Sequence, residues 1–402
     1  MTEFSKVFAR LSIATLFVLS CAISSLAASG GPRYLVTNND ILNNTNTASV
    51  YTISSTGKLA LKTVLQVGDQ GVGGGNFGVN RVSIRQDKNG NCAYVSNAEF
   101  PTTQDIAGIS LKTLKVTGHF HGSDADNGED HGVGLVANEH YLYAAFTVTN
   151  TIATFRVLPG CKLKFLGDIT THPSQHGGTA LNGMALHGSM LVVSYLFGVV
   201  ESFNVSKGLP VSNGDQQITT GNATGNEPES VDITADGHFA IFADFQKNSS
   251  LNSTVVEVSD LSSGKLTATK VYKLGAGPGN ASANLLLSPD ESLLYVTNNI
   301  GGTITATPFD KAKGTFGKSC ETKVLRGFVL FGNFLAGLAN QTNTGTGGLV
   351  YVAEWGQPSS IGVVKVSKTK SGCTVVEAPE SPVSDPNSQG LQSIGTFPPR
   401  SF

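Results

Sequence analysis

The chain has 402 residues, of which only 14% are charged, and it contains 47 glycines. So few charged residues and so many glycines favour a turn-rich β protein over a helical one. The formal net charge of −2 creates no strong field of either sign. Neither nucleic acid nor an anionic membrane is therefore an expected partner.

The first 28 residues have the organisation of a signal peptide. Basic residues precede an apolar stretch at 11–23, and small residues follow up to Ala28. This stretch is shorter than the roughly 20 residues that a membrane-spanning helix needs. Cys21 offers a lipoprotein alternative, although the residues before it match that motif poorly. We expect residues 1–28 to be removed and 29–402 to form one domain of a secreted, periplasmic or cell-surface protein.

A short strand pattern recurs along the chain. An aromatic or aliphatic residue is followed by two β-forming residues and then by Asn or a substitute. The seven copies begin at Tyr34, Tyr94, Tyr143, Val192, Ile241, Tyr295 and Tyr351. The step is 49 residues from the second copy to the fifth, and 54 and 56 residues thereafter. A steady step of this size is typical of stacked supersecondary units.

Each copy has further short strands around it. Residues 82–84 and a polar turn precede the second copy, and residues 151–157 and 163–169 follow the third. Four antiparallel strands per repeat predict an all-β, seven-bladed β-propeller with four-stranded blades. The first copy lacks its preceding strand, and residues 389–395 resemble it. We therefore expect the N- and C-terminal strands to close the ring within one blade.

Four cysteines follow the signal peptide, and none has the Cys-x-x-Cys spacing of a zinc or redox site. An even number suits an oxidising compartment. We favour disulfides between Cys92 and Cys161 and between Cys320 and Cys373, since each would join neighbouring blades. Free thiols are the alternative.

The strand Tyr-Val-Thr-Asn at 295–298, with the turns Ser-Pro-Asp at 288–290 and Ala-Asp-Gly at 235–237, resembles the seven-bladed lactonase-like propellers. These include 6-phosphogluconolactonases of the propeller type, 3-carboxy-cis,cis-muconate lactonising enzymes and exported Tyr-Val-Thr-Asn repeat proteins. The resemblance covers nearly the whole mature chain. It indicates architecture more than chemistry.

The resemblance implies four catalytic elements in the lactonase members: a His-x-His motif opening the third blade, an Arg-His pair opening the fourth, a Glu ending the second strand of the fourth, and an Arg after the Ser-Asn of the fifth. His131 matches the second His. The fourth blade opens instead with Thr-Ala-Leu-Asn-Gly at 179–183, Tyr195 takes the Glu position, and the fifth blade reads Ala-Asp-Phe at 243–245. Without the arginines, no cations would hold a substrate carboxylate or phosphate.

Ligands of propellers usually bind at one mouth of the channel, where innermost strands begin and second strands end. The repeat maps the following residues to that end: Asn38, Asn80, Arg81, Asn97, Glu99, His131, Asn182, Tyr195, Glu229, Asp244, Asn298, Glu354 and Trp355. Acids outnumber Arg81, which favours a cationic or polyhydroxylated ligand. The alternative is that these side chains cap strand ends and hold channel water.

Two other segments are candidates for binding. His119 and His121 share one face of an expected strand, and His131 could approach them to form a metal site. An exposed acidic loop is the alternative. Residues 73–78 match the letters of a dinucleotide fingerprint, but no helix follows, so we interpret residues 68–78 as a flexible blade connection. Nucleotide binding is the alternative.

The leading hypothesis is an exported propeller, non-catalytic or weakly catalytic, that binds a small polar ligand or a protein partner at the mouth. One alternative is a lactonase or muconate cycloisomerase in which His131 acts as acid or base with Glu229 or Asp244 nearby. Another is a surface adhesin or scaffold that uses the blade rims. We expect a monomer with no cofactor other than the metal alternative.

Overall fold

The strands of Arg33–Phe402, one compact unit, form seven separate antiparallel sheets. We number them as blades 1 to 7 in chain order. The computed structural model describes residues 32–68, 70–71, 73, 80–97, 106–122, 133–147, 149–171, 179–218, 226–246, 253–276, 281–299, 301–322, 325–326, 334–340, 347–356, 358–391 and 393–399. The expected signal peptide lies outside these residues.

Blades 1 to 4 contain four strands each. Blade 1 has β1 (Tyr34–Asn38), β2 (Asn46–Ile53), β3 (Leu59–Gly68) and β30 (Ser393–Phe397). Blade 2 has β4 (Val82–Asp87), β5 (Gly90–Ser96), β6 (Ile106–Ser110) and β7 (Lys115–Phe120). Blade 3 has β8 (Val133–Ala137), β9 (Tyr141–Phe146), β10 (Thr151–Leu158) and β11 (Lys162–Thr170). Blade 4 has β12 (Thr179–His187), β13 (Met190–Leu196), β14 (Val199–Asn204) and β15 (Val211–Gln217).

Blades 5 to 7 follow the same order. Blade 5 has β16 (Asn226–Ile233), β17 (Phe239–Gln246), β18 (Ser253–Asp260) and β19 (Thr267–Ala276). Blade 6 has β20 (Ser282–Leu287), β21 (Leu293–Asn298), β22 (Thr303–Asp310) and two short strands, β23 (Thr315–Phe316) and β24 (Cys320–Glu321). Blade 7 has β25 (Phe334–Asn340), β26 (Gly347–Trp355), β27 (Ser360–Thr369), β28 (Gly372–Glu377) and the short β29 (Val383–Ser384).

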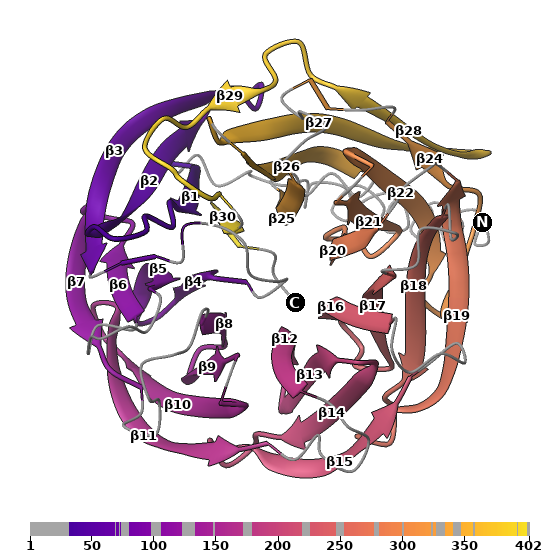
Figure 1. The fold of residues 1–402 in the computed structure, drawn as a ribbon, viewed down its shortest axis with the longest axis horizontal. Helices are drawn as coiled ribbons and strands as arrows, with labels where there is room; N and C mark the ends of the chain where they lie inside the picture. The colour runs from indigo at the N-terminus through magenta and orange to yellow at the C-terminus, as the bar shows by residue number, and fades with distance from the viewer. Residues whose placement is uncertain are drawn as a thin grey trace, which may run out of the picture. The chain divides into compact units, whose positions relative to one another are not determined.

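The blades form a ring with β30, β4, β8, β12, β16, β20 and β25 nearest its centre (Figure 1). The predicted seven-bladed, all-β propeller is therefore confirmed. The described residues contain no helix long and apolar enough to cross a membrane.

The ring closes in blade 1, as predicted. β30 pairs with β1 in antiparallel register, with Tyr34 opposite Phe397 and Asn38 opposite Ser393. The C-terminal strand thus supplies the innermost strand of a blade whose other strands come from the beginning of the domain. Closure pairs an edge that would otherwise expose unbonded backbone groups.

Seven apolar clusters lie between the blades, one at each junction. Successive residues of a strand point to opposite faces, so each second strand supplies two junctions. In β13, Val192 packs toward blade 5 and Val193 toward blade 3. Both faces of a blade are buried against neighbouring blades. Successive residues of the repeated second strand are therefore largely apolar, rather than alternating between apolar and polar.

Two disulfides also connect neighbouring blades. Cys92 of blade 2 bonds Cys161 of blade 3, and Cys320 of blade 6 bonds Cys373 of blade 7. These are the pairs that the sequence favoured. They span 69 and 53 residues respectively, so each restricts a long loop of the unfolded chain.

Replacing Cys92 and Cys161 together with alanine should therefore lower the free energy of unfolding by about 2 to 4 kcal/mol. Urea unfolding, followed by far-UV circular dichroism with the other disulfide intact, measures this change. An unchanged midpoint would show that the first disulfide adds nothing to the apolar junction between blades 2 and 3.

Candidate functional site

The described residues among those mapped to the channel mouth lie at one end of their blades. In blade 5, Pro228 near the start of β16 pairs with Asp244 near the end of β17. Tyr195, Asn298 and Glu354 hold corresponding positions in the second strands of blades 4, 6 and 7. We call this the mouth end of the propeller.

Most of these side chains are withdrawn from solvent. Asn80 is exposed and Trp355 is half-buried. The other described members are buried, namely Asn38, Arg81, Asn97, Asn182, Tyr195, Glu229, Asp244, Asn298 and Glu354. Glu99 and His131 lie outside the described residues, so their place at the mouth stays a prediction. For the buried members, the contacts indicate which ones hold the blades together.

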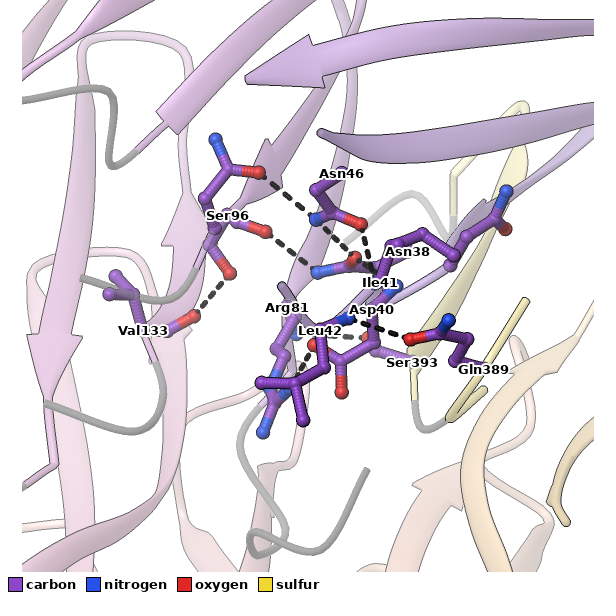
Figure 2. Close-up of polar contacts among 12 residues, drawn as sticks. Asn38, Asp40, Ile41, Leu42, Asn46, Arg81, Ser96, Val133, Gln389 and Ser393 are labelled. Atoms are coloured by element: carbon purple, nitrogen blue, oxygen red, sulfur yellow. Dashed lines mark hydrogen bonds and ion pairs between the residues drawn. The ribbon is translucent and has the colours of Figure 1, made fainter. Parts of the chain in front are cut away.

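Asparagines connect blades 1 and 2 at the mouth end (Figure 2). The Asn38 amide donates to the carbonyl oxygen of Ser96 at 2.7 Å and accepts from Asn46 at 3.0 Å. The Asn46 amide also donates to Asn97 Oδ1 at 3.0 Å, and Asn97 donates to the carbonyl oxygen of Val67 at 2.9 Å. The Asn that ends each of these two repeats is thus a connector between blades.

Asn298 and Tyr195 also turn toward the fold. Asn298 Nδ2 donates to Thr303 and Thr305 at 2.9 Å, and its Oδ1 accepts from Thr254 of blade 5 at 2.8 Å. The Tyr195 hydroxyl donates to Glu201 at 2.8 Å. We therefore assign Asn97, Asn298 and Tyr195 structural roles and leave them out of the candidate site.

Arg81 takes part in a buried ion pair beside the ring closure. Its Nη1 lies 2.8 Å from Asp40 Oδ1, and both side chains are 2% exposed. The Arg81 amide donates to Ser393 Oγ at 2.9 Å (Figure 2). The pair neutralises the guanidinium charge within the fold, so Arg81 is poorly placed to hold an anionic ligand.

The start of the glycine-rich segment packs against this ion pair. The amides of Gly71 and Gly73 donate to the carbonyl oxygens of Ile41 and Asp40 at 2.6 and 3.0 Å. A Cβ on Gly71 would lie 2.4 Å from the carbonyl carbon of Asp40, so this approach requires glycine. Residues 74–79 lie outside the described residues. The described glycines serve as a blade connection, as expected.

The inner strands of blades 4 to 7 contain β-bulges that were not predicted from the sequence. The pairing register shifts beside Asn182 in β12 and Glu229 in β16, and also within β20 and β25. The inner strands of blades 1 to 3 pair without a shift. Bulges redirect side chains and are common beside binding sites. Gly183 and Pro228 were the available signals, because Gly and Pro inside a strand mark bulges.

The bulges of blades 4 and 5 lie close together. A Cβ on Gly183 would come within 2.7 Å of the carbonyl oxygen of Glu229. Asn182 is 1% exposed, and neither polar atom of its side chain has a hydrogen-bond partner among the described residues. An unbonded buried polar group costs roughly 1 to 3 kcal/mol. Asn182 therefore offers a donor and an acceptor to a bound molecule.

Acidic side chains gather at the same end of blade 5. Glu227, Glu229, Asp244 and Glu257 are at most 5% exposed, and the Glu227 amide donates to Asp244 Oδ1 at 3.1 Å. Burial, and then the charge of Asp244, raise the pKa of Glu257 to about 9. Glu257 is therefore uncharged at neutral pH, which limits repulsion within the cluster.

We call Asn182, Glu229 and Asp244 the bulge site. Its carboxylates accept hydrogen bonds from hydroxyl or ammonium groups, and its amide both donates and accepts. None of these three residues is a cation that could stabilise an oxyanion or hold a phosphate. The mapped residues therefore fall into two classes. Some make structural contacts within or between blades, and these three form a polar, acidic group.

Glu354 of blade 7 is buried at a corresponding position. Ser360 Oγ donates to its Oε2, while Oε1 has no partner among the described residues. Burial and, to a smaller extent, the charge of Glu377 raise the pKa of Glu354 to about 7. Its charge therefore changes near neutral pH.

Two of the three expected metal ligands lie at the outer edge of blade 2. His119 is exposed on β7, which is the outermost strand of blade 2, and His121 is half-buried just beyond it (Figure 1). His131 lies outside the described residues. Within the described ranges, no three His, Cys, Asp or Glu side chains are grouped to hold a metal. The three-histidine site stays a prediction.

The sequence profile of the family described as "Lactonase, 7-bladed beta-propeller" matches residues 133–387, which is more than half of the chain. The chain belongs to this lactonase propeller family. The match begins with the inner strand of blade 3 and includes the bulge site. No curated protein sequence matches the chain.

Solved structures similar to this lactonase propeller show the same fold. A 6-phosphogluconolactonase candidate from Bacteroides fragilis is 14% identical, with a TM-score of 0.65, and the match covers 92% of this chain and 99% of that one. A second candidate, from Bacteroides uniformis, is 13% identical with a TM-score of 0.62, covering 91% and 99%. A functionally unknown protein from Desulfotomaculum acetoxidans is 15% identical with a TM-score of 0.60, covering 91% and 99%.

The connector role of Asn38 predicts a large effect of its removal. Asn38→Ala leaves the Asn46 amide and the Ser96 carbonyl without this partner, so the free energy of unfolding should fall by about 2 to 3 kcal/mol. Urea unfolding measures the loss. Asn44→Ala, on an exposed turn nearby, should change it by less than about 0.5 kcal/mol. Equal effects of the two substitutions would refute the connector role.

The raised pKa of Glu354 predicts a pH dependence of stability. Because its folded pKa exceeds the unfolded one, its contribution is complete below about pH 4.5 and is lost as the pH rises through about 7, by about 3 kcal/mol. Glu354→Gln should remove this loss, so that stability falls less between pH 5 and 8 in pH-resolved urea unfolding. Glu380→Gln, at an exposed position, should retain the wild-type profile.

Proposed function

We propose that this propeller binds a small polyhydroxylated or cationic ligand at its mouth end, with the bulge site as the main contact. The observation that carries the proposal is the ion pair of Arg81 with Asp40. It engages Arg81, the one arginine of the mapped set, within the fold, whereas Glu229 and Asp244 contribute carboxyl groups to the mouth end. These carboxylates attract hydroxyl and ammonium groups and repel phosphates. A basic side chain of a protein partner would suit the same groups.

Family membership favours a second candidate function, the hydrolysis of a lactone. His131 would act as acid or base, as the resemblance to the lactonases implies, with Glu229 or Asp244 beside it. An uncharged lactone fits an acidic mouth better than a phosphorylated or carboxylated one, because charged substrates need cations at the site.

Export forms part of the proposal. The signal-peptide pattern of residues 1–28 indicates it. Two disulfides are compatible with an extracellular location, because such bonds persist in oxidising compartments.

Ligand binding should be detectable as thermal stabilisation. Sugars, neutral aldonolactones and polyamines are the probes, and a ligand at about 100 times its Kd should add about 2.7 kcal/mol of stability. Glu229→Gln and Asp244→Asn should each reduce the shift strongly, because each removes one carboxylate from the bulge site. Asp236→Asn, on an exposed turn at the other end of blade 5, should leave it unchanged.

Turnover separates the two candidate functions. Hydrolysis of a stabilising lactone that is lost in His131→Ala, while ligand-free stability is retained, would establish the lactonase function. Stabilisation without turnover supports binding alone. Stabilisation only by 6-phosphogluconolactone, or shifts equal in Glu229→Gln and wild type, would contradict the acidic binding site.

A further inference from the structure

A groove of about 390 Å³ lies on the outer side of the propeller, between blades 5 and 6. One wall is Tyr272–Gly275, in the outermost strand β19. The other is the segment 316–321, which includes β24 and the ends of the interrupted outer strand of blade 6. This volume falls within the range of ligand sites, roughly 300 to 1,000 Å³. The groove is separate from the bulge site at the inner strands.

Both walls of the groove are held in place by the fold. Cys320 is bonded to Cys373 of blade 7, and the Gly317 amide donates to the carbonyl oxygen of Pro308 at 2.8 Å. At one end, Tyr272 and Phe316 stack edge to face with their centroids 4.9 Å apart. The Tyr272 hydroxyl donates to the carbonyl oxygen of Gly314 at 3.0 Å. A ligand would therefore meet a preformed surface.

The groove carries a positive charge. Lys273 and Lys318, one on each wall, are exposed, and neither forms an ion pair with a described residue. The carboxylate of Glu321 also lines the groove, but it accepts hydrogen bonds from Thr303 at 2.5 Å and from Asn298 at 3.2 Å. The two ammonium groups thus face solvent while the acid is engaged within the fold.

The excess of exposed positive charge in the groove agrees with the distribution of charged side chains over all the described residues. Nine of the 21 described Asp and Glu side chains are buried, against two of the 22 described Lys and Arg side chains. Among the described residues, the charged side chains that are not buried are therefore mostly basic. Exposed basic side chains attract anionic partners, whereas the acidic mouth end repels them.

The backbone of the groove walls favours an extended chain. Among the strands of the described residues, β19 pairs only with β18 and β24 only with β22, so both are sheet edges there. Outward-facing N–H and C=O groups of an edge strand can pair with an added strand. Four consecutive residues of β19 line the groove, a length of roughly 13 Å in a strand.

We propose that this groove binds an acidic peptide segment in an extended conformation. Its backbone pairs with the edge of β19, and its carboxylates lie against Lys273 and Lys318. Acidic residues of the segment suit the two lysines, and apolar residues between them suit the aromatic pair of Tyr272 and Phe316 at one end of the groove.

The test uses a fluorescein-labelled octapeptide of alternating Glu and Val, with binding measured by fluorescence anisotropy at low salt. Lys273→Glu combined with Lys318→Glu should raise the Kd about tenfold or more, since charge-assisted contacts dominate the interaction. Lys162→Glu combined with Lys164→Glu changes the charge equally at exposed positions on β11 of blade 3, and should leave the Kd within about twofold. Thermal unfolding verifies that both variants are folded.

Two further probes test the mode of binding. A peptide with Pro in place of the central Val residues cannot pair along the edge, so it should bind at least about tenfold more weakly. Oligogalacturonate, an acidic chain without amides, should not displace the peptide. The proposal would be overturned if the Glu-Val peptide did not bind, or if both lysine pairs weakened its binding equally. It would also be overturned if the Pro peptide bound equally well, or if oligogalacturonate displaced the peptide. None of these outcomes bears on ligands at the mouth end.

Discussion

Each blade of this propeller buries apolar side chains on both faces, so each needs a neighbour on either side. Seven clusters meet this requirement at seven junctions, and β30, paired with β1, contributes Ile394 and Phe397 to the two junctions of blade 1. The closing strand therefore completes blade 1 and covers the faces of blades 2 and 7. Disulfides reinforce two of the other junctions.

The polar groups at the mouth end differ between the two halves of the ring. Between blades 1 and 2, asparagine amides and the Arg81–Asp40 pair satisfy one another at the mouth end. Blades 4 to 7 have bulged inner strands instead, and two adjacent bulges bring Asn182 and Glu229 together. The inner strands of blades 1 to 3 keep a regular hydrogen-bond ladder, whereas the bulged strands redirect individual side chains.

The described acidic and basic side chains are distributed differently between the interior and the surface. Several acids are buried in blade 5, where Glu257 in its third strand, β18, is neutral because its pKa is raised. Lysines remain on the outer strands, where the groove between blades 5 and 6 presents two of them. A formal charge near zero conceals this separation, which is why composition alone gave no reason to expect an anionic partner.

The sequence by itself determined the number of blades and the closing strand, because a repeating strand pattern is local and its copies count the blades. It only favoured the disulfide pairs, which the structure then showed. Only the tertiary structure separated Asn97 and Asn298, which connect blades, from Asn182, which has no partner among the described residues. The repeat maps all three to the mouth end of the propeller. Their partners come from other blades, as with Asn97 and Asn46, 51 residues apart. Whether a buried amide is satisfied is therefore decided by long-range packing.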